Sequence, residues 1–177
     1  ETAIAWADVL SFLTSRRGLL DGVVLSGGEP TLQTALPQAI AELRALGFRI
    51  GLHSAGPYPE RLAKLLPQLD WIGFDVKAPF AEYDRITGVP GSGERARHSL
   101  DHVLASGVAY QLRTTVHPKL LDDDAVQRLR TELAALGVRD HHIQEFRAIG
   151  CADPRLNPSA AAGGYHQGTI AEPRQLA

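Results

Sequence analysis

Sulfur-containing residues are scarce in this chain of 177 residues: cysteine occurs once, as Cys151, and methionine does not occur. One cysteine cannot form an intrachain disulfide, so a disulfide-stapled scaffold is excluded. An excess of charge is also lacking, because 18 basic and 20 acidic side chains leave a formal net charge of -2. We therefore expect no general nucleic-acid binding.

Long hydrophobic runs are missing as well. No uninterrupted apolar run approaches the roughly 18–20 residues of a membrane span, and no secretory signal precedes the first predicted helix. We expect no membrane partner and a cytoplasmic location. The chain starts at Glu1 and enters a helical pattern without a leading strand, which we interpret as the mark of a fragment or a processed chain.

Apolar residues alternate between helical spacing and short continuous runs, which indicates alternating helices and strands. The runs predict strands at residues 22–26, 48–52, 71–76, 108–116 and 143–146, the first of them buried on both faces. Helical spacing is carried by Trp6, Val9, Leu10 and Leu13; by Leu32, Leu36, Ile40 and Leu43; by Leu62, Leu65, Leu66 and Leu69; by Leu100, Val103 and Leu104; and by Val126, Leu129, Leu133 and Leu136.

This order predicts parallel βαβ units and an α/β fold with right-handed crossovers. The predicted strands are too few for a closed eight-stranded barrel, so an open partial barrel or a doubly wound sheet fits. In either case ligands should bind at the carboxyl ends of the strands. Residues 88–94 and the tail from Cys151 onward are rich in glycine, proline or alanine, and we expect irregular structure there.

The first predicted strand is followed by Gly27, Gly28, Glu29 and Pro30. The glycines let a ligand approach the backbone closely, and Glu29 adds a carboxylate that can accept hydrogen bonds from an ammonium group. Pro30 can occupy the start of a helix. The alternative is an ordinary strand-to-helix turn with a solvated glutamate.

The third predicted strand ends with Asp75 and Lys77, which are two residues apart and should share one face of the sheet. The two charges could pair with each other. They could instead bind the two ends of a zwitterion, Lys77 taking its carboxylate and Asp75 its ammonium. We favour the second reading, because burying a charge pair without a use costs stability.

The motif at residues 27–30 resembles the S-adenosylmethionine (SAM) binding motif of the radical SAM superfamily. The resemblance implies a partial (β/α) barrel with residues 1–150 as its core and 151–177 as a tail, and it implies SAM and a 4Fe-4S cluster as cofactors. Its implied SAM-binding residues are Gly27, Gly28, Glu29, Pro30, Ser54, Asp75, Lys77, Arg113 and Arg147. His53 stands where related activating enzymes carry an acidic residue.

The cluster ligands implied by this resemblance are absent from the chain. Family members hold the cluster on a Cys-x-x-x-Cys-x-x-Cys loop before the glycine motif, yet none of the 26 residues preceding Gly27 is cysteine. Cys151 alone cannot hold a cluster. We expect an N-terminal cluster-binding segment to be missing and this chain alone to be inactive; a cluster-less, non-catalytic relative remains an alternative.

Longer stretches extend the resemblance to glycyl-radical-activating enzymes, in particular the activating protein of anaerobic ribonucleoside-triphosphate reductase. This implies reductive cleavage of SAM, a glycyl radical on that reductase, and an electron donor such as a flavodoxin or ferredoxin. The matching stretches are residues 52–62, 74–79, 83–88 and 144–147.

Two other enzyme functions stay open. One is a radical SAM enzyme acting on a small molecule, such as 7-carboxy-7-deazaguanine synthase. The other is an aldolase-like enzyme with a Schiff base on Lys77, which would leave the motif at residues 27–30 unexplained.

Overall fold

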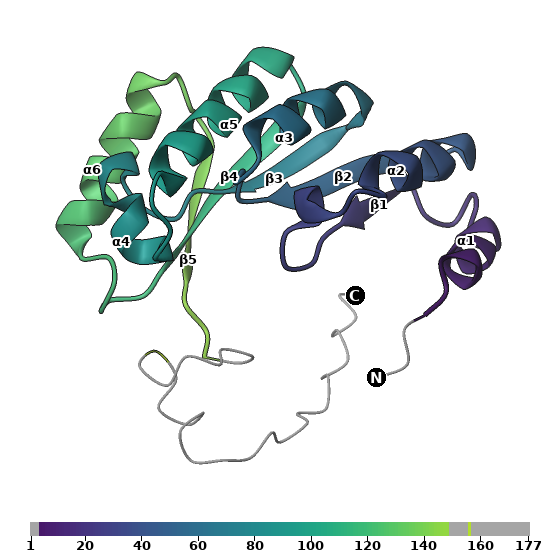
Figure 1. Ribbon diagram of the computed structural model, residues 1–177, viewed down its shortest axis with the longest axis horizontal. Coiled ribbons are helices and arrows are strands. Elements are labelled where there is room, and N and C mark those ends of the chain that lie inside the picture. The colour runs from purple at the N-terminus through teal and green to yellow at the C-terminus, as the bar shows by residue number, and fades with distance from the viewer. Residues whose placement is uncertain (1–3, 149–155, 157–177) are drawn as a thin grey trace, which may run out of the picture. The chain divides into compact units, whose positions relative to one another are not determined.

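The computed structural model describes residues 4–148 and Leu156. Its first compact unit, Glu1–Glu145, contains a five-stranded parallel sheet in the order β1-β2-β3-β4-β5 (Figure 1). The strands are β1 (Gly22–Leu25), β2 (Arg49–Ser54), β3 (Trp71–Asp75), β4 (Ala109–Val116) and β5 (His141–Glu145). Each strand therefore lies beside its neighbours in sequence, and the predicted α/β fold is confirmed.

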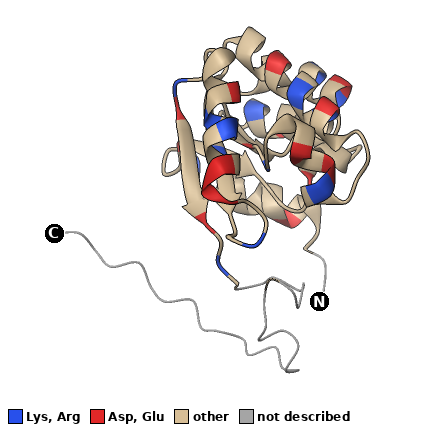
Figure 2. Cartoon of the chain, turned by 90° about the vertical axis from the view of Figure 1, so that its left-hand side faces the viewer, with Lys and Arg blue, Asp and Glu red and all other residues tan. Residues whose placement is uncertain are grey.

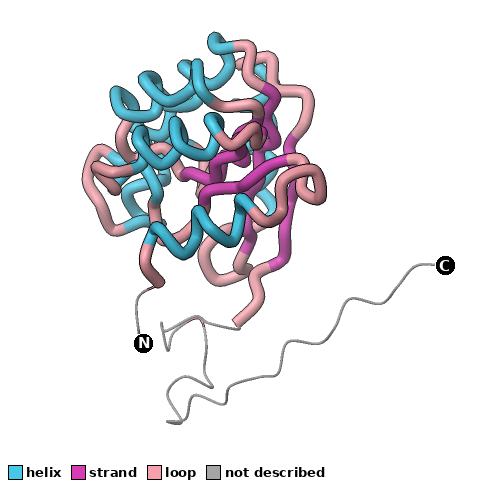
Figure 3. The backbone as a smooth tube through the Cα atoms, turned by 90° about the vertical axis from the view of Figure 1, so that its right-hand side faces the viewer, coloured by secondary structure: helices cyan, strands magenta, loops and turns pink. Residues whose placement is uncertain are grey.

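The helices that connect the strands all lie against the same face of the sheet, as Figures 1 and 3 show from two directions. Right-handed crossovers that always step in one direction place every helix on one side. The sheet is thus singly wound, as in a partial barrel, and not doubly wound. The helices are α1 (Trp6–Thr14), α2 (Leu36–Ala45), α3 (Pro59–Leu65), α4 (Tyr83–Thr87), α5 (Ser92–Ser106) and α6 (Asp123–Ala135), with 3-10 turns at Pro30–Leu32, Leu66–Gln68 and Phe80–Glu82.

The hydrophobic core lies between the sheet and these helices. Side chains alternate along each strand, so every second residue points under the helices, and those positions are almost all apolar. The strand residues with 0% exposure on this side are Ile50, Leu52, Ile72, Phe74 and Leu112.

The residues between them point to the opposite face, which we call the open face because no helix among the described residues covers it (Figure 1). The register pairs His53 with Gly73 and Asp75 with Arg113, so each pair projects to the same side. Polar side chains can occupy these positions because solvent or a ligand can still reach them. The open face carries Val24, His53, Trp71, Asp75, Gln111 and Arg113.

The prediction that the first strand is buried on both faces is wrong. In β1 exposed and partly buried residues alternate, and Val24 is 53% exposed. β1 pairs only with β2 among the described strands, so it is the edge of the sheet, and only one of its faces packs under helices.

Several predicted boundaries also shift; for example, α3 ends at Leu65, before the predicted helix position Leu69. Helix α2 begins at Leu36, while Leu32 ends a 3-10 turn and is exposed. Residues 88–94 are not all loop, because α5 begins at Ser92. The carboxylate of Asp84 accepts hydrogen bonds from the backbone N–H groups of Gly91 and Ser92, which lowers the pKa of Asp84 and fixes the start of α5.

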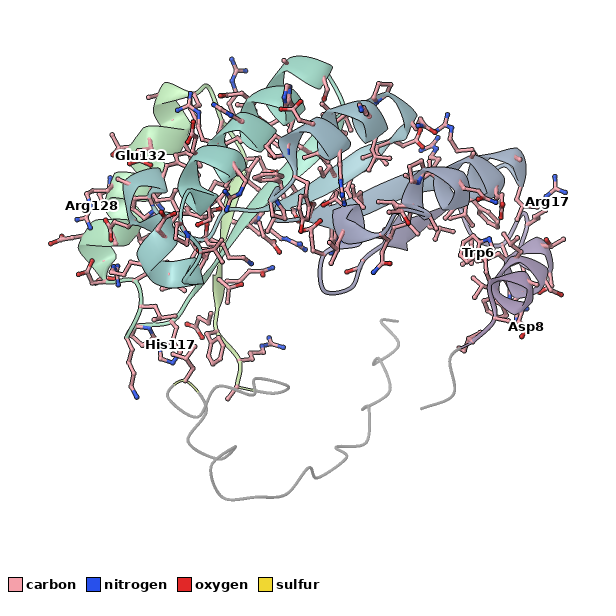
Figure 4. All side chains as sticks on the ribbon, in the orientation of Figure 1. Trp6, Asp8, Arg17, His117, Arg128 and Glu132 are labelled. Atoms are coloured by element: carbon pink, nitrogen blue, oxygen red, sulfur yellow. The ribbon has the colours of Figure 1, made fainter. Side chains whose placement is uncertain are left out.

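Helix α1 is joined to α2 by a side-chain contact. Figure 4 shows Trp6 pointing from α1 toward α2, where its indole Nε1 donates to a carboxylate oxygen of Glu42. Together with a second donor, Gln38, this bond lowers the pKa of Glu42. Elsewhere on the helices acidic and basic side chains are interspersed (Figure 2).

No helix among the residues described is long and apolar enough to span a bilayer.

The loop after β3 is fixed by Tyr83, which is 2% exposed. Its hydroxyl accepts a hydrogen bond from the backbone N–H of Lys77 at 2.8 Å. Gly93 allows this close packing, because a Cβ at that position would lie 2.1 Å from the carbonyl oxygen of Phe80. The stretch at residues 83–88, which resembles the activating enzymes, therefore has a structural role in holding Lys77 at the end of the sheet.

Replacing Tyr83 with phenylalanine should lower the free energy of unfolding by about 1–2 kcal/mol, because the Lys77 N–H loses its partner in a partly buried loop. Urea denaturation measures this, and the slope with denaturant should not change. Tyr58→Phe, which alters an exposed ring, is the matched control. Equal stabilities of the two variants would contradict the role of the Tyr83 hydroxyl.

Candidate functional site

The carboxylate of Glu29 joins the loops that follow β1 and β2. Within its own loop it accepts hydrogen bonds from the backbone N–H of Thr31 at 3.0 Å and from the Thr31 hydroxyl. From the second loop it accepts from the hydroxyl of Ser54 at 2.9 Å and from the backbone N–H of Ala55 at 3.1 Å. The carboxyl ends of two neighbouring strands are thus held in one arrangement by a single side chain.

These contacts change the reading of Glu29. A carboxylate offers about four acceptor positions, two on each oxygen. Three donors of the chain bind Oε1 of Glu29, whereas Oε2 accepts only from the backbone N–H of Ala55. The side chain therefore has a structural role that the sequence did not reveal. Binding of an ammonium group by this carboxylate stays a prediction, and the backbone of the two glycines before it becomes the more accessible part of the motif.

Gly27 and Gly28 have open space where a side chain would lie. A Cβ added at either position would meet no atom within 4 Å. Gly27 also has a φ of +143°, which side chains rarely adopt, so glycine is required there by conformation. Gly28 has no such constraint. Pro30 is buried at the start of the 3-10 turn and directs the chain away from the motif.

The loop after β2 is held by several hydrogen bonds and close contacts. Ser54 is 3% exposed, and its hydroxyl also accepts from the backbone N–H of Gly56 at 3.0 Å. Gly56 is required, because a Cβ there would lie 2.6 Å from both the Phe74 ring and the Ser99 side chain. The Ser99 hydroxyl donates to the Gly56 carbonyl at 2.7 Å. The predicted site residue Ser54 thus lies beside Glu29 and helps to fix the loop.

Asp75 forms its ion pair with Arg113 and not with Lys77. The guanidinium of Arg113 donates to one carboxylate oxygen of Asp75 through Nε at 3.0 Å and approaches the same oxygen through Nη2 at 2.9 Å. Both residues lie at the carboxyl end of the open face. The second oxygen of Asp75 and the remaining guanidinium N–H groups are the polar atoms that a zwitterionic ligand could use.

Lys77 lies two residues beyond β3, which ends at Asp75. The backbone N–H of Val76 still donates to the carbonyl of Arg113, and the shared face of Asp75 and Lys77 stays a prediction. Lys77 is exposed, and its backbone is held by Tyr83. The structure therefore brings Glu29 and Ser54 together in one group and Asp75 and Arg113 together in another. Lys77 belongs to neither group and lies just after β3.

His53 and Trp71 form an aromatic pair on the open face that the sequence did not single out. Their ring centroids are 5.4 Å apart. The pair fits because the strands carry glycine beneath it: a Cβ at Gly73 would lie 2.9 Å from His53 Cδ2, and one at Gly51 would lie 3.2 Å from Trp71 Cε3. The sequence signal for this pair is a glycine inside a buried strand, which often marks a position where another group lies close to the backbone.

The pKa of His53 is lowered by partial burial and, secondarily, by the positive charge of Arg113. His53 is therefore expected to be neutral at neutral pH, with one ring nitrogen able to donate and the other able to accept. This places an uncharged hydrogen-bonding group beside the ion pair of Asp75 and Arg113.

Two other predictions fall outside this group. Arg147 lies in the second compact unit, Phe146–Ala177, so its contact with adenosine stays a prediction. Cys151 lies outside the described residues. Within residues 4–148 and Leu156, no group of three or more His, Cys, Asp or Glu side chains could hold a metal ion.

Comparison with known proteins supports the sequence resemblance. The family model of the radical SAM superfamily matches residues 7–131, which is well over half of the 177 residues. The solved structure of a domain of pyruvate-formate lyase-activating enzyme from Bacteroides vulgatus matches with a TM-score of 0.56 and 15% identity, covering 79% of this chain and 94% of that one. At this identity the match shows the shared fold alone.

Curated relatives differ in the chemistry that their names state. A protein of Methanocaldococcus jannaschii, provisionally named a glycyl-radical enzyme activating enzyme, is 29% identical over 114 residues, covering 60% of this chain and 48% of that protein. The S-adenosylmethionine-dependent nucleotide dehydratase of a Thermoplasmatales archaeon is 29% identical over 116 residues, covering 63% and 41%. The chain thus spans half or less of the length of these relatives.

Replacing Glu29 with glutamine should lower the free energy of unfolding by about 1.5–3 kcal/mol, because the amide cannot accept from all four donors and its NH2 group would face one of them. Chemical denaturation measures the change. Glu60→Gln, on the exposed first turn of α3, is the matched control and should change stability little. A Glu29→Gln chain as stable as the wild type would show that the two loops do not depend on this carboxylate.

Proposed function

Because this chain belongs to the radical SAM superfamily, we propose that it is the SAM-binding part of an enzyme that forms a glycyl radical on a partner protein. The observation that carries the proposal is the arrangement at the carboxyl end of the sheet, where an open glycine backbone follows β1 and an ion pair between β3 and β4 lies on the uncovered face. The partner we propose is anaerobic ribonucleoside-triphosphate reductase, with a flavodoxin or ferredoxin as electron donor.

The residues of the site fit the methionyl part of SAM, which carries an ammonium and a carboxylate. The backbone carbonyl groups of Gly27 and Gly28 would accept from the ammonium group. The guanidinium of Arg113, and the ammonium of Lys77 just after β3, would bind the carboxylate. The role of Asp75 is then to orient Arg113, and the role of Glu29 and Ser54 is to hold the glycine loop in place. When bound and reduced, SAM supplies the 5'-deoxyadenosyl radical that abstracts hydrogen.

The described residues do not fit a 4Fe-4S cluster. Its thiolate ligands are absent from them, and no cluster of metal-binding side chains replaces these ligands in the part of the chain that the structure describes. We propose that the cluster is held by residues outside this chain.

Several observations support a glycyl radical product. The Methanocaldococcus relative carries that name, and the matching stretches at residues 74–79 and 83–88 form the loop that positions Lys77. A glycine residue of a protein is also a suitable target, because its α-carbon has no side chain to block approach. The open face would have to admit a loop of the partner, and no described helix closes it.

A small-molecule substrate is the second candidate. It is favoured by the equal identity, 29%, of the nucleotide dehydratase. The neutral His53 and the ring of Trp71 would then contact the substrate on the open face. The experiment below distinguishes the two candidates.

The full-length protein, mixed without oxygen with SAM, a reductant and anaerobic ribonucleotide reductase, should produce a glycyl radical doublet in electron paramagnetic resonance. Omitting SAM is the control and should leave no signal. Cleavage of SAM without a protein radical, together with turnover of a nucleotide-like metabolite, would reject the activating-enzyme function in favour of the second candidate.

Gly28→Ala provides a separate test of the SAM site. The variant should fold with unchanged stability, because its Cβ meets no atom and its backbone conformation suits alanine. In the full-length protein it should weaken SAM binding about tenfold or more, because the methyl group occupies the space that the ligand needs. Calorimetric titration with SAM and a thermal melt separate the two effects. Unchanged SAM affinity would show that the ligand does not approach this backbone.

A further inference from the structure

A pocket on the helix side of the sheet lies directly behind the glycine loop. It has a volume of about 390 Å³, which is the size of a small-molecule site. The 3-10 turn after the motif, the first turn of α2, and helix α3 with the turn that follows it form its walls. The residues that line it are Thr31, Gln33, Thr34, Leu36, Pro37, Arg61, Lys64, Leu65 and Gln68.

The charge of this pocket has one sign. Arg61 and Lys64 line it, and no acidic side chain does. Among the described residues Lys64 forms no salt bridge, so its ammonium group is available to a ligand. Leu36 and Leu65 give the pocket an apolar floor. An occupant should therefore combine a negative charge with a small aliphatic body.

Arg61 connects the pocket to the glycine loop. One nitrogen of its guanidinium, Nη1, donates to the backbone carbonyls of Thr31 and Leu32, each at 3.2 Å, and its plane lies over the Tyr58 ring. Thr31 is the same residue whose backbone N–H and hydroxyl donate to Glu29. A ligand carboxylate that draws the guanidinium of Arg61 toward Lys64 would weaken the two bonds that Nη1 donates to these carbonyls, and the change would reach Glu29 through Thr31.

We propose that this pocket binds a small free carboxylate with an aliphatic body, and that Arg61 transmits its binding to the glycine loop. Lys64 supplies the principal ion pair, and Arg61 supplies both a second donor and the connection. The pocket lies on the opposite side of the sheet from the open face, so the carboxylate would not compete with SAM for space. The proposal is independent of the function of the open face.

The test is a titration of this chain with hexanoate, followed by the backbone amide signals in NMR. Hexanoate should cause saturable shifts at Thr34 and Lys64, and the uncharged isostere hexanamide should bind at least fivefold more weakly. Lys64→Ala should weaken hexanoate binding about fivefold, as expected for an ion pair at a solvent-accessible site, and Lys64→Arg should restore it. Lys119→Ala, in the loop after β4, is the matched control and should bind as the wild type does.

The connection through Arg61 has its own readout. In the wild type, hexanoate should also shift the amides of Thr31 and Ala55, which donate to Glu29; in Arg61→Gln the shifts at Lys64 should remain and those at Ala55 should disappear. Equal binding of hexanoate and hexanamide, or binding unaffected by Lys64→Ala, would overturn the carboxylate site. Saturable shifts at Lys64 with none at Thr31 and Ala55 in the wild type would overturn the connection.

Discussion

The arrangement of the candidate site depends on one carboxylate. Glu29 accepts hydrogen bonds from Thr31 in its own loop and from Ser54 and Ala55 in the next, so it holds together the carboxyl ends of β1 and β2. Parallel strands share no tight turn, and their ends are free to diverge unless a side chain joins them. Because hydrogen bonds to a charged acceptor are stronger than those between neutral groups, a single residue can fix two loops. The glycine backbone is thereby presented in a defined position before any ligand arrives, which reduces the ordering cost of binding.

The second constraint is that helices cover only one face of the sheet. Every connection steps in the same direction, so the strand residues under the helices are mostly apolar, while the open side carries polar residues together with Val24 and Trp71. Gly51 and Gly73 then leave room for the large rings of Trp71 and His53 above the strands, and the ion pair of Asp75 and Arg113 lies at the carboxyl end of the same surface. The face of the sheet under the helices is thus buried and provides stability, while the open face is accessible to solvent and carries the polar groups of the candidate site. The burial that lowers the pKa of His53 comes from this arrangement of rings on the sheet.

The α/β fold class could be predicted from the sequence, because apolar periodicity and glycine stops are local signals. These signals left a doubly wound sheet open, and the partial barrel was implied by the family resemblance. The partners of the site side chains could not be predicted, because the register between neighbouring strands decides which residues lie beside each other. Asp75 pairs with Arg113, which is 38 residues away, and the sequence offered the nearer Lys77 instead. The start of α5 was missed for a similar reason: the carboxylate that caps it, Asp84, lies in another helix. The motif at residues 27–30 was recognised, yet the structural role of Glu29 became visible only when the second loop was placed beside it.

The exposed edge strand β1 has a consequence for the behaviour of this chain in solution. Among the described strands β1 pairs on one side only, so its other side presents backbone N–H and C=O groups in a row, next to the exposed side chains of Leu20 and Val24. β1 itself carries no lysine or proline, the residues with which native proteins commonly protect such an edge. An edge of this kind is a template on which another strand can pair, and a charged residue introduced there would oppose such pairing.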